Sequence, residues 1–265
     1  MSFASSGTGY SMDLLARRLG AKVKFSDAER ALLAQNHSAR CYDAGSTVPM
    51  PEEPALRPTL IVSGWACREE ITVSGDRQLM SILLPGDLIW SNCEQSRPLD
   101  LLEVVAISKL TVINVASAMR MIAQNPERWP SITRGLELMG MADERRTIEH
   151  VVRLGAQPAL QRVAGVILEL AERCREIGFM TGAVFVMPMT QAAIGNFVGL
   201  SVVHASRVLR ILREMCVIRM RPGTMEIVDM AGLARLATDG DAQRIRFPAR
   251  RPRDAGPRAL EMSAA

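Results

Sequence analysis

The sequence predicts an α+β protein with an N-terminal antiparallel β-roll, one long helix and a C-terminal winged helix-turn-helix. Three observations lead to this prediction. Residues 41–115 contain short β-prone runs separated by turn signals, and residues 125–154 form a long helical pattern with few glycines. Residues 190–212 contain two short amphipathic helices around Gly199. A strand-rich segment followed by a helix-rich one is typical of the α+β class.

The composition is that of a globular chain with room for two domains. The chain has 265 residues, of which 48% are hydrophobic and 23% are charged. The N-terminus is polar and rich in Gly and Ser, without an apolar segment of signal-peptide length. No run approaches the ~20 apolar residues that a membrane span needs. We therefore expect a cytoplasmic protein that does not enter a membrane.

The cysteines give no indication of a disulfide framework or a zinc site. They form no C-x-x-C pair and no zinc-ligand spacing. Reduced thiols in a cytoplasmic protein are the simplest interpretation, and we expect no metal. The five cysteines are Cys41, Cys67, Cys93, Cys174 and Cys216.

Positive charge is concentrated in two places. The formal net charge is +4, and residues 190–221 contain five arginines but only one acid, Glu214. This clustering favours a polyanionic partner. Residues 240–265 are rich in Arg, Pro and Ala without periodicity, so we expect a disordered basic tail, and residues 1–12 are expected to be a disordered N-terminus.

The β-roll is predicted over residues 13–124. Its first part, Asp13 to Gln35, has a helical pattern. Short strands at regular spacing, interrupted by turns, then predict a small antiparallel roll or barrel. The turn signals are Asp43-Ala-Gly45, Val62-Ser-Gly64, Val73-Ser-Gly-Asp76 and Pro85-Gly-Asp87.

The long helix is predicted over residues 125–155, with Pro126 and Pro130 in its first turns, where proline is tolerated. Its apolar stripe has a spacing near 3.5 residues, which favours pairing with a second helix, as in a dimer. The alternative is a single long helix packed on its own domain. The predicted dimer-interface residues are Ile132, Leu136, Met139, Met141, Ile148 and Val152.

The helix-turn-helix pattern lies within a predicted domain over residues 156–239. A helix over 160–175 and a loop from Gly178 to Gly182 precede the helix-turn-helix. Gly195 gives the close helix crossing and Gly199 the turn that this motif needs. Thr190 and Ser201 stand at N-cap positions. Apolar residues that can join the two helices are Ile194, Val198, Leu200, Ala205 and Val208.

The second helix has two distinct faces. On a helical wheel one face is apolar (Ala205, Val208, Leu209 and Leu212), and the other has Val203, Ser206, Arg207, Arg210 and Arg213. An ordinary amphipathic surface helix would look similar. Two short strands, 217–220 and 225–228, follow around a Pro-Gly turn and predict a wing that can lie beside DNA.

These motifs resemble a known family. The segment from Arg153 to Ala237, with TQAAIGNFVGLSVVHASRVLRILREMCVIRM, resembles the C-terminal domain of the Crp/Fnr transcription regulators. Upstream, LIVSGWACREEITVSGDRQLMSILLPGDLIW (60–90) is similar to the family's cyclic-nucleotide-type β-roll. The resemblance implies a homodimer joined along the long helix, with Ser201 to Glu214 of each copy in the major groove of a palindromic site in double-stranded DNA. RNA polymerase is a further partner to expect of such a regulator.

The resemblance also suggests which residues contact DNA. Arg207 aligns with the family's base-contacting arginine, and its guanidinium can bind guanine O6 and N7 together. Ser206 and Val203 occupy neighbouring contact positions, and His204 lies at the edge of the same face. Val203 replaces a frequent glutamate, so the operator is expected to differ from that of glutamate-bearing members. The predicted phosphate contacts are Gln191, Ser201, Arg210 and Arg213.

The sensor half departs from the cyclic-nucleotide pattern. Alignment places Trp90-Ser91 and Asp100 where nucleotide-binding members have Gly-Glu and Arg, and an aspartate repels a phosphate. Arg97 could substitute after a small alignment shift, so cyclic-nucleotide control stays an alternative. Cys41, Cys67 and Cys93 could converge as a redox or iron-sulfur site, but buried inert thiols are the preferred interpretation. Only His37 could offer a haem ligand from this half, and we predict no cofactor.

Two other functional classes fit the sequence less well. A metal-dependent cupin enzyme needs several histidines in one barrel, whereas this chain has three, His37, His150 and His204, in separate segments. No catalytic constellation stands out, so we do not expect an enzyme. A protein-interaction module or a low-specificity nucleoid-type DNA-binding protein would keep the helix-turn-helix but lack sequence preference. The signal, the operator and the direction of regulation stay open.

Overall fold

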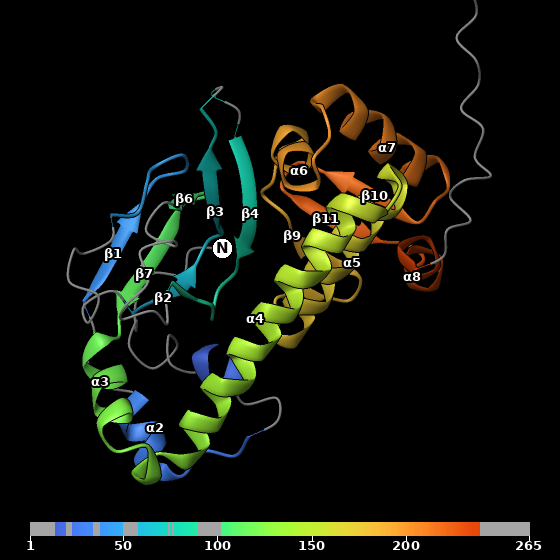
Figure 1. The fold of residues 1–265 in the computed structure, drawn as a ribbon. Coiled ribbons are helices and arrows are strands. Elements are labelled where there is room, and N and C mark those ends of the chain that lie inside the picture. Colours follow the sequence, from blue (N-terminus) through green and yellow to red (C-terminus); the bar gives the residue numbers. More distant parts are fainter. Residues whose placement is uncertain are drawn as a thin grey trace, which may run out of the picture.

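In the computed structural model, the protein has two layered parts. The long helix α4 (Pro130–Ala156) joins them and runs diagonally across the molecule (Figure 1). The structure describes residues 14–19, 23–33, 38–49, 58–73, 75, 77–89 and 102–238. The predicted disordered segments 1–12 and 240–265 lie outside these residues.

The described residues of the N-terminal region form two helical stretches, so the helical pattern expected over 13–35 is present but interrupted. Residues 14–19 are helical, residues 23–26 are not, and α2 (Asp27–Leu33) follows. Ser26 starts α2, because its hydroxyl accepts a hydrogen bond from the Glu29 N–H at 3.3 Å while the Glu29 carboxylate accepts one from the Ser26 N–H at 2.8 Å. This reciprocal pair is a capping box. The letters Ser-Asp-Ala-Glu therefore carried a helix-start signal.

Glu29 also fixes the start of the long helix. Its second carboxylate oxygen accepts hydrogen bonds from the backbone N–H groups of Ser131 (2.8 Å) and Ile132 (3.2 Å). These N–H groups have no partner inside α4, and a negative charge there is favourable to the helix dipole. Burial alone would raise the pKa of Glu29, but the hydrogen bonds from Ser26, Ile132 and Ser131 lower it. One carboxylate thus joins α2 to α4.

The β-roll consists of two antiparallel sheets packed face to face. One sheet has the strand order β1 (Ala39–Tyr42), β7 (Leu110–Asn114), β2 (Thr59–Ser63), β5 (Leu88–Ile89). The other has the order β4 (Arg77–Leu83), β3 (Ala66–Ile71), β6 (Glu103–Ala106). The side chains buried between them are Val48, Ile61, Ala66, Leu83, Ile89, Val104, Ala106, Leu110 and Val112.

The four predicted turns of the roll are present. Each contains a glycine with a left-handed backbone, where φ is between 81° and 89°: Gly45, Gly64, Gly75 and Gly86. At Gly64 the constraint is also steric, since a Cβ atom there would lie 2.2 Å from the Lys109 carbonyl oxygen. The turn signals in the sequence therefore reflected real conformational requirements.

The long helix begins later than predicted. After α3 (Ala116–Gln124), residues Pro126–Arg128 form a 3₁₀ turn, and α4 starts only at Pro130. Trp129 has φ −126° and ψ 50°, outside the helical region, because a residue that precedes proline is disfavoured in the α conformation. The prediction that the helix starts at residue 125 is wrong for this reason.

The first half of α4 is covered within its own chain. Ile132 and Met139 are buried, and Leu136 is partly buried, against Leu15, Leu19 and their neighbours. Placing these three residues at a dimer interface therefore needs correction, since the N-terminal helices already fill the space around them. Further along, Met141, Ile148 and Val152 are exposed, as is Val151.

The C-terminal part contains a helical layer and a four-stranded antiparallel sheet of order β10-β11-β9-β8. The predicted wing is the β10–β11 hairpin around Gly223. The loop predicted from Gly178 to Gly182 is partly wrong, because it contains strand β8, which pairs with β9. The elements are α5 (Ala159–Glu176), β8 (Met180–Thr181), β9 (Val184–Val186), α6 (Gln191–Val198), α7 (Val202–Glu214), β10 (Ile218–Arg221), β11 (Thr224–Ile227) and α8 (Met230–Thr238).

The two parts share one hydrophobic core. The outer face of the β4-β3-β6 sheet belongs to the same buried cluster as α5, α6 and α7, through Trp65, Leu79 and Ile82. Figure 1 shows β4 lying beside α6, and the Gln78 amide donates a hydrogen bond to the Asn196 carbonyl at 2.9 Å. The roll therefore contacts the helix-turn-helix directly, in addition to the connection through α4.

Candidate nucleic-acid interface

The helix-turn-helix is built from local signals. The Thr190 hydroxyl accepts a hydrogen bond from the Ala193 N–H at 3.0 Å, and the Ser201 hydroxyl accepts one from the His204 N–H at 3.3 Å. Gly199 ends α6 in the left-handed conformation, with φ 64°. The chain bends by 103° between α6 and α7, which is a usual angle for this motif. Both N-caps and the turn glycine thus occupy the predicted positions.

Close packing of the two helices depends on Gly195. A Cβ atom at this position would lie 2.7 Å from the Leu200 carbonyl oxygen and 3.4 Å from the Ala205 methyl group. The Leu200 N–H also donates to the Gly195 carbonyl at 2.9 Å. A larger residue at 195 would push the turn away from α6, so glycine fixes where α7 begins.

One face of α7 belongs to the core and the other is open to solvent. Ala205, Val208, Leu209 and Leu212 are at most 1% exposed. On the opposite face, Val203 is 70% exposed, and Arg207, Arg210 and Arg213 are all exposed, while His204 and Ser206 are half-buried. The predicted base-contact residues therefore lie together on the accessible side of α7.

The three arginines of α7 differ in their local partners. The Arg210 Nε atom lies 3.7 Å from a Glu214 carboxylate oxygen, one turn along the helix. Within the described part of the chain, neither Arg207 nor Arg213 forms an ion pair. Gln191 is exposed at the first turn of α6, and Ser201 is exposed at the start of α7. The cationic surface is thus only partly neutralised.

The wing adds a second pair of arginines. Arg219 on β10 forms an ion pair with Glu226 on β11, with an N–O distance of 2.6 Å. Arg221 is exposed next to the turn at Gly223, and no carboxylate in the described residues pairs with it. In the sequence, Arg221 is one of five clustered arginines, and its position alone predicts no role. Its place at the wing turn is what marks it out.

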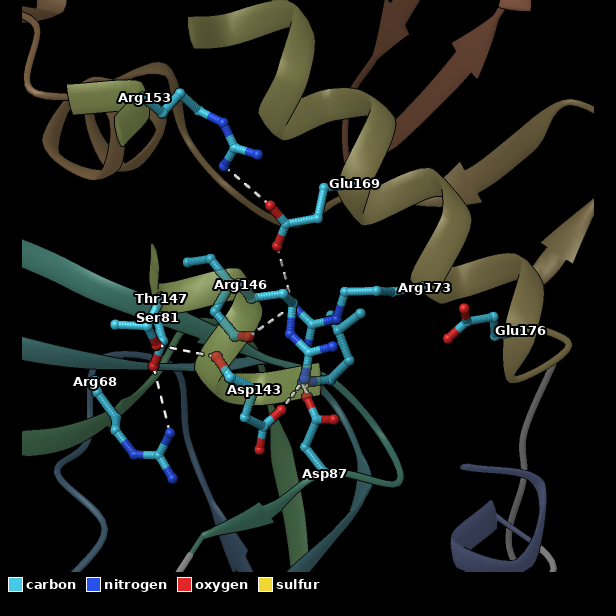
Figure 2. Close-up of polar contacts among 12 residues, drawn as sticks. Arg68, Ser81, Asp87, Asp143, Arg146, Thr147, Arg153, Glu169, Arg173 and Glu176 are labelled. Carbon is cyan, nitrogen blue, oxygen red and sulfur yellow. Dashed lines mark hydrogen bonds and ion pairs between the residues drawn. The ribbon is translucent and has the colours of Figure 1, made fainter. Parts of the chain in front are cut away.

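A buried ion network, which no sequence pattern predicted, lies where the roll meets α4 and α5. Asp87 accepts hydrogen bonds from the Arg173 guanidinium at 2.5 Å, from the Arg18 guanidinium at 3.0 Å and from the Leu84 N–H at 2.7 Å. Burial alone would raise the pKa of Asp87, but Arg173 and Arg18 lower it to about 2. Figure 2 shows Arg173 reaching from α5 toward Asp87.

The comparisons with known proteins fit this geometry. Residues 161–236 match the model of the Crp-like helix-turn-helix domain. The nitrogen fixation regulation protein FixK of Azorhizobium caulinodans is 26% identical over 180 residues, which are 67% of this chain and 70% of FixK. The anaerobic regulatory protein of Haemophilus influenzae is 26% identical over 186 residues, 66% of this chain and 67% of that protein.

A solved structure extends the likeness to the whole architecture. The structure of FixK2 from Bradyrhizobium japonicum has a TM-score of 0.63 and 22% identity, and it covers 76% of this chain and 98% of FixK2. The fold is therefore the β-roll plus helix-turn-helix of Crp/Fnr structures. The chain is therefore similar in sequence and in fold to the Crp/Fnr regulators. Its relatives are transcription regulators rather than enzymes, which supports a role in DNA-binding transcription regulation.

The cysteines of the N-terminal roll and of α5 lie in unlike environments. Cys67 is buried, and its burial raises the pKa of the thiol to about 12, as burial also does for Cys174. Cys41 is exposed, contrary to the preferred interpretation, and its sulfur lies 3.7 Å from the Thr111 hydroxyl. Cys93 lies outside the described residues. The two described roll cysteines are on strands of different sheets.

The predicted sensor positions are mostly outside the described residues. These positions are His37, Trp90, Ser91, Arg97 and Asp100. Among the residues that the structure describes, no three His, Cys, Asp or Glu side chains are grouped so as to hold a metal ion.

Among the described helices, no single one is long and apolar enough to cross a membrane. Only α6 and α7 taken together would do so by length and composition, and they are the bent helix-turn-helix pair.

Proposed function

We propose that this regulator acts as a homodimer on a palindromic operator, with α7 of each copy in the major groove and an N-terminal sensor roll that responds to a signal of unknown identity. The observation that carries the proposal is the accessible face of α7. Its apolar residues are fully used by the core, so the exposed face is free to enter a groove that admits one helix.

Base recognition is assigned to one side of α7. Arg207 is exposed without an ion-pair partner among the described residues, so its guanidinium can bind guanine O6 and N7 without first breaking an internal contact. Val203 is 70% exposed and can pack against a thymine methyl group. Ser206 and His204 are half-buried beside them and can contact adjacent bases or phosphates.

Phosphate contacts are assigned to the rim of the same surface. Arg213 and Gln191 are exposed and can bind the backbone, and Ser201 has a hydroxyl hydrogen left to donate after capping α7. Arg210 can bind as well, but Glu214 competes for its charge. Such contacts give affinity and register, while base contacts give sequence choice.

The second half of α4 is proposed as the dimer interface. Met141, Ile148, Val151 and Val152 are each more than half exposed, and they repeat along the helix at the spacing of a two-helix seam. Nothing in the described part of the chain covers them. The corresponding helix of a second copy would bury this stripe and would place the two recognition helices symmetrically.

The dimer is tested by a matched pair of substitutions. Ile148→Glu introduces a charge in the proposed interface, and Ile71→Glu introduces the same charge on β3, where the native side chain is 52% exposed against 57% for Ile148. Sedimentation equilibrium is expected to give a dimer for the wild type and Ile71→Glu and a monomer for Ile148→Glu. A dimeric Ile148→Glu variant would contradict the assignment.

The DNA target is tested by selection from a random-sequence duplex library with the full-length protein, with candidate effectors and under oxidising conditions as further arms. We expect a palindrome with half-sites about one helical turn apart, on the order of 34 Å. Binding that depends on salt but not on sequence would support the nucleoid-type alternative. Enrichment only with a cyclic nucleotide would support the cyclic-nucleotide alternative.

A further inference from the structure

We propose that Asp87 is a positioning residue for DNA binding, because its carboxylate fixes α5, and with it the recognition helix α7, relative to the sensor roll. This inference rests on the proposed dimeric, palindromic mode of binding and adds a charged connection between roll and helix-turn-helix to the shared apolar core and the dimer helix. It assigns a function to the Leu-Pro-Gly-Asp turn at residues 84–87.

The turn itself is held rigidly in the roll. Asp87 closes it by accepting a hydrogen bond from the Leu84 N–H at 2.7 Å, and Gly86 has φ +89°. A Cβ atom at Gly86 would lie 3.2 Å from the Leu14 carbonyl oxygen and 3.2 Å from the Arg18 side chain. The carboxylate of Asp87 therefore has a defined position, set by the roll and the N-terminal helix.

Arg173 brings α5 to that position. One guanidinium nitrogen donates to Asp87 at 2.5 Å, and another donates to the Ile82 carbonyl on β4 at 3.0 Å. Both acceptors belong to the roll, whereas Arg173 belongs to α5. Because a guanidinium is planar, two simultaneous bonds fix its orientation as well as its distance.

The helix α5 transmits this position to α7. Its buried residues, among them Val166, Ile167 and Leu170, share one core with Leu209 and Leu212 of α7 and with Phe197 of α6. Close-packed cores move as units, since small shifts create voids or clashes. A displacement of Arg173 from the roll is therefore a displacement of the recognition helix.

The same stretch of α5 is also tied to the long helix. Glu169, one turn before Arg173, accepts a hydrogen bond from Arg153 of α4 at 2.9 Å, as Figure 2 shows. His150, on the same helix, stacks on Phe197 of α6 with 4.3 Å between ring centroids. Roll, dimer helix and DNA-binding helices thus meet around one short charged segment.

Charge makes Asp87 the central member of this network. Arg18 and Arg173 both contact it while less than a tenth of each side chain is exposed, and Arg146 lies near enough for burial, Arg173 and Arg18 to lower its pKa to about 10. Without a carboxylate between them, buried like charges repel. A buried ion pair adds little net stability but allows few alternative arrangements, which suits a positioning role.

The test compares two neutralising substitutions in the full-length protein. Asp87→Asn removes the central charge, and the control Glu176→Gln removes the carboxylate that contacts the same Arg18 at the exposed rim, at 3.1 Å. Affinity is measured on palindromic duplexes whose half-sites are moved together or apart by single base pairs. A role in fold stability alone would lower affinity for every spacing equally.

We expect the wild type and Glu176→Gln to prefer one spacing by a factor on the order of ten, and Asp87→Asn to prefer it by less than about twofold. The choice of half-site sequence is expected to stay unchanged. A folded Asp87→Asn protein with the wild-type spacing preference would overturn the inference. A wild type without any palindrome preference would instead overturn the proposed function.

A second variant covers the case in which Asp87→Asn does not fold. Arg173→Lys retains the charge beside Asp87, but an ammonium on a flexible stem does not impose the planar two-acceptor geometry. We expect a folded dimer with the same loss of spacing preference, and thermal unfolding in two steps where the wild type unfolds in one. One cooperative transition together with an unchanged spacing preference would also overturn the inference.

Discussion

The arginines of this protein fall into two groups that differ in burial and pairing. The sequence alone does not distinguish the two groups, but the structure does. Arg18, Arg153 and Arg173 are buried, and each contacts a carboxylate of its own chain. Arg207 and Arg213 are exposed on α7, with no ion pair in the described residues. An arginine that is paired internally stabilises one arrangement of the chain, whereas an unpaired one is available to a polyanion. Clustering in the sequence alone could not make this distinction.

The largest expected effect is a loss of unfolding free energy when a buried arginine is replaced. Arg173→Leu removes the hydrogen bonds to Asp87 and to the Ile82 carbonyl and leaves Asp87 with Arg18 and the Leu84 N–H. Breaking a buried pair in this way costs up to about 3 to 5 kcal/mol of unfolding free energy. Arg134→Leu removes the exposed pair with Glu137 and is expected to cost less than about 1 kcal/mol. Urea unfolding measures both. Equal costs would mean that the network is not buried as described.

Lowering the pH should selectively reduce the contribution of the buried Asp87 ion pairs to stability. The pKa of Asp87 is about 2 in the folded protein, against about 3.9 when unfolded, so its contribution is present above pH 4 and is lost as pH falls toward 2. The stability difference between the wild type and Asp87→Asn is therefore expected to shrink by about 2 kcal/mol between pH 4 and pH 2. A difference independent of pH would contradict the ion pair.

Substitutions of the exposed arginines should affect DNA affinity and leave stability nearly unchanged. Arg213→Ala is expected to leave the unfolding free energy within about 0.5 kcal/mol of the wild type. It should weaken binding to all duplexes alike and reduce the slope of log affinity against log salt by about 1, because one phosphate contact is lost. Titrations at several salt concentrations measure this. A loss confined to specific sites would contradict the phosphate assignment.

Arg210→Ala should have the smallest effect on the same slope. Glu214, 3.7 Å from the Arg210 guanidinium, already offsets part of its charge, so replacement is expected to change the slope by less than about 1. Glu214→Gln should correspondingly strengthen binding to any duplex. If Arg210→Ala and Arg213→Ala have equal slopes, internal pairing does not separate the two residues.

The DNA-binding half was largely predictable because its signals are local. Thr190 and Ser201 cap helices whose first turns follow directly, and Gly195 and Gly199 serve contacts a few residues away. The apolar and cationic faces of α7 follow from its 3.6-residue period alone. Strand β8 was missed because two residues next to glycines carry almost no pattern.

The buried network and the division of α4 depend on contacts far apart in the sequence. Arg173 lies between Leu170 and Cys174, on the buried side of α5, and a charge on an apolar face was the available sign that a buried partner exists. The partner, Asp87, is 86 positions away. Likewise, the apolar stripe on α4 does not indicate which part of it the N-terminal helices cover.

We propose that the unpaired Arg207 on the open face of α7 gives the protein its sequence choice. The most direct measurement is the affinity of the wild type and Arg207→Ala for the selected operator and for duplexes substituted at each base pair. We predict a loss of about 1 to 3 kcal/mol for Arg207→Ala on the operator, with discrimination abolished at one symmetric pair of positions and retained elsewhere. Unchanged discrimination at every position would contradict the account.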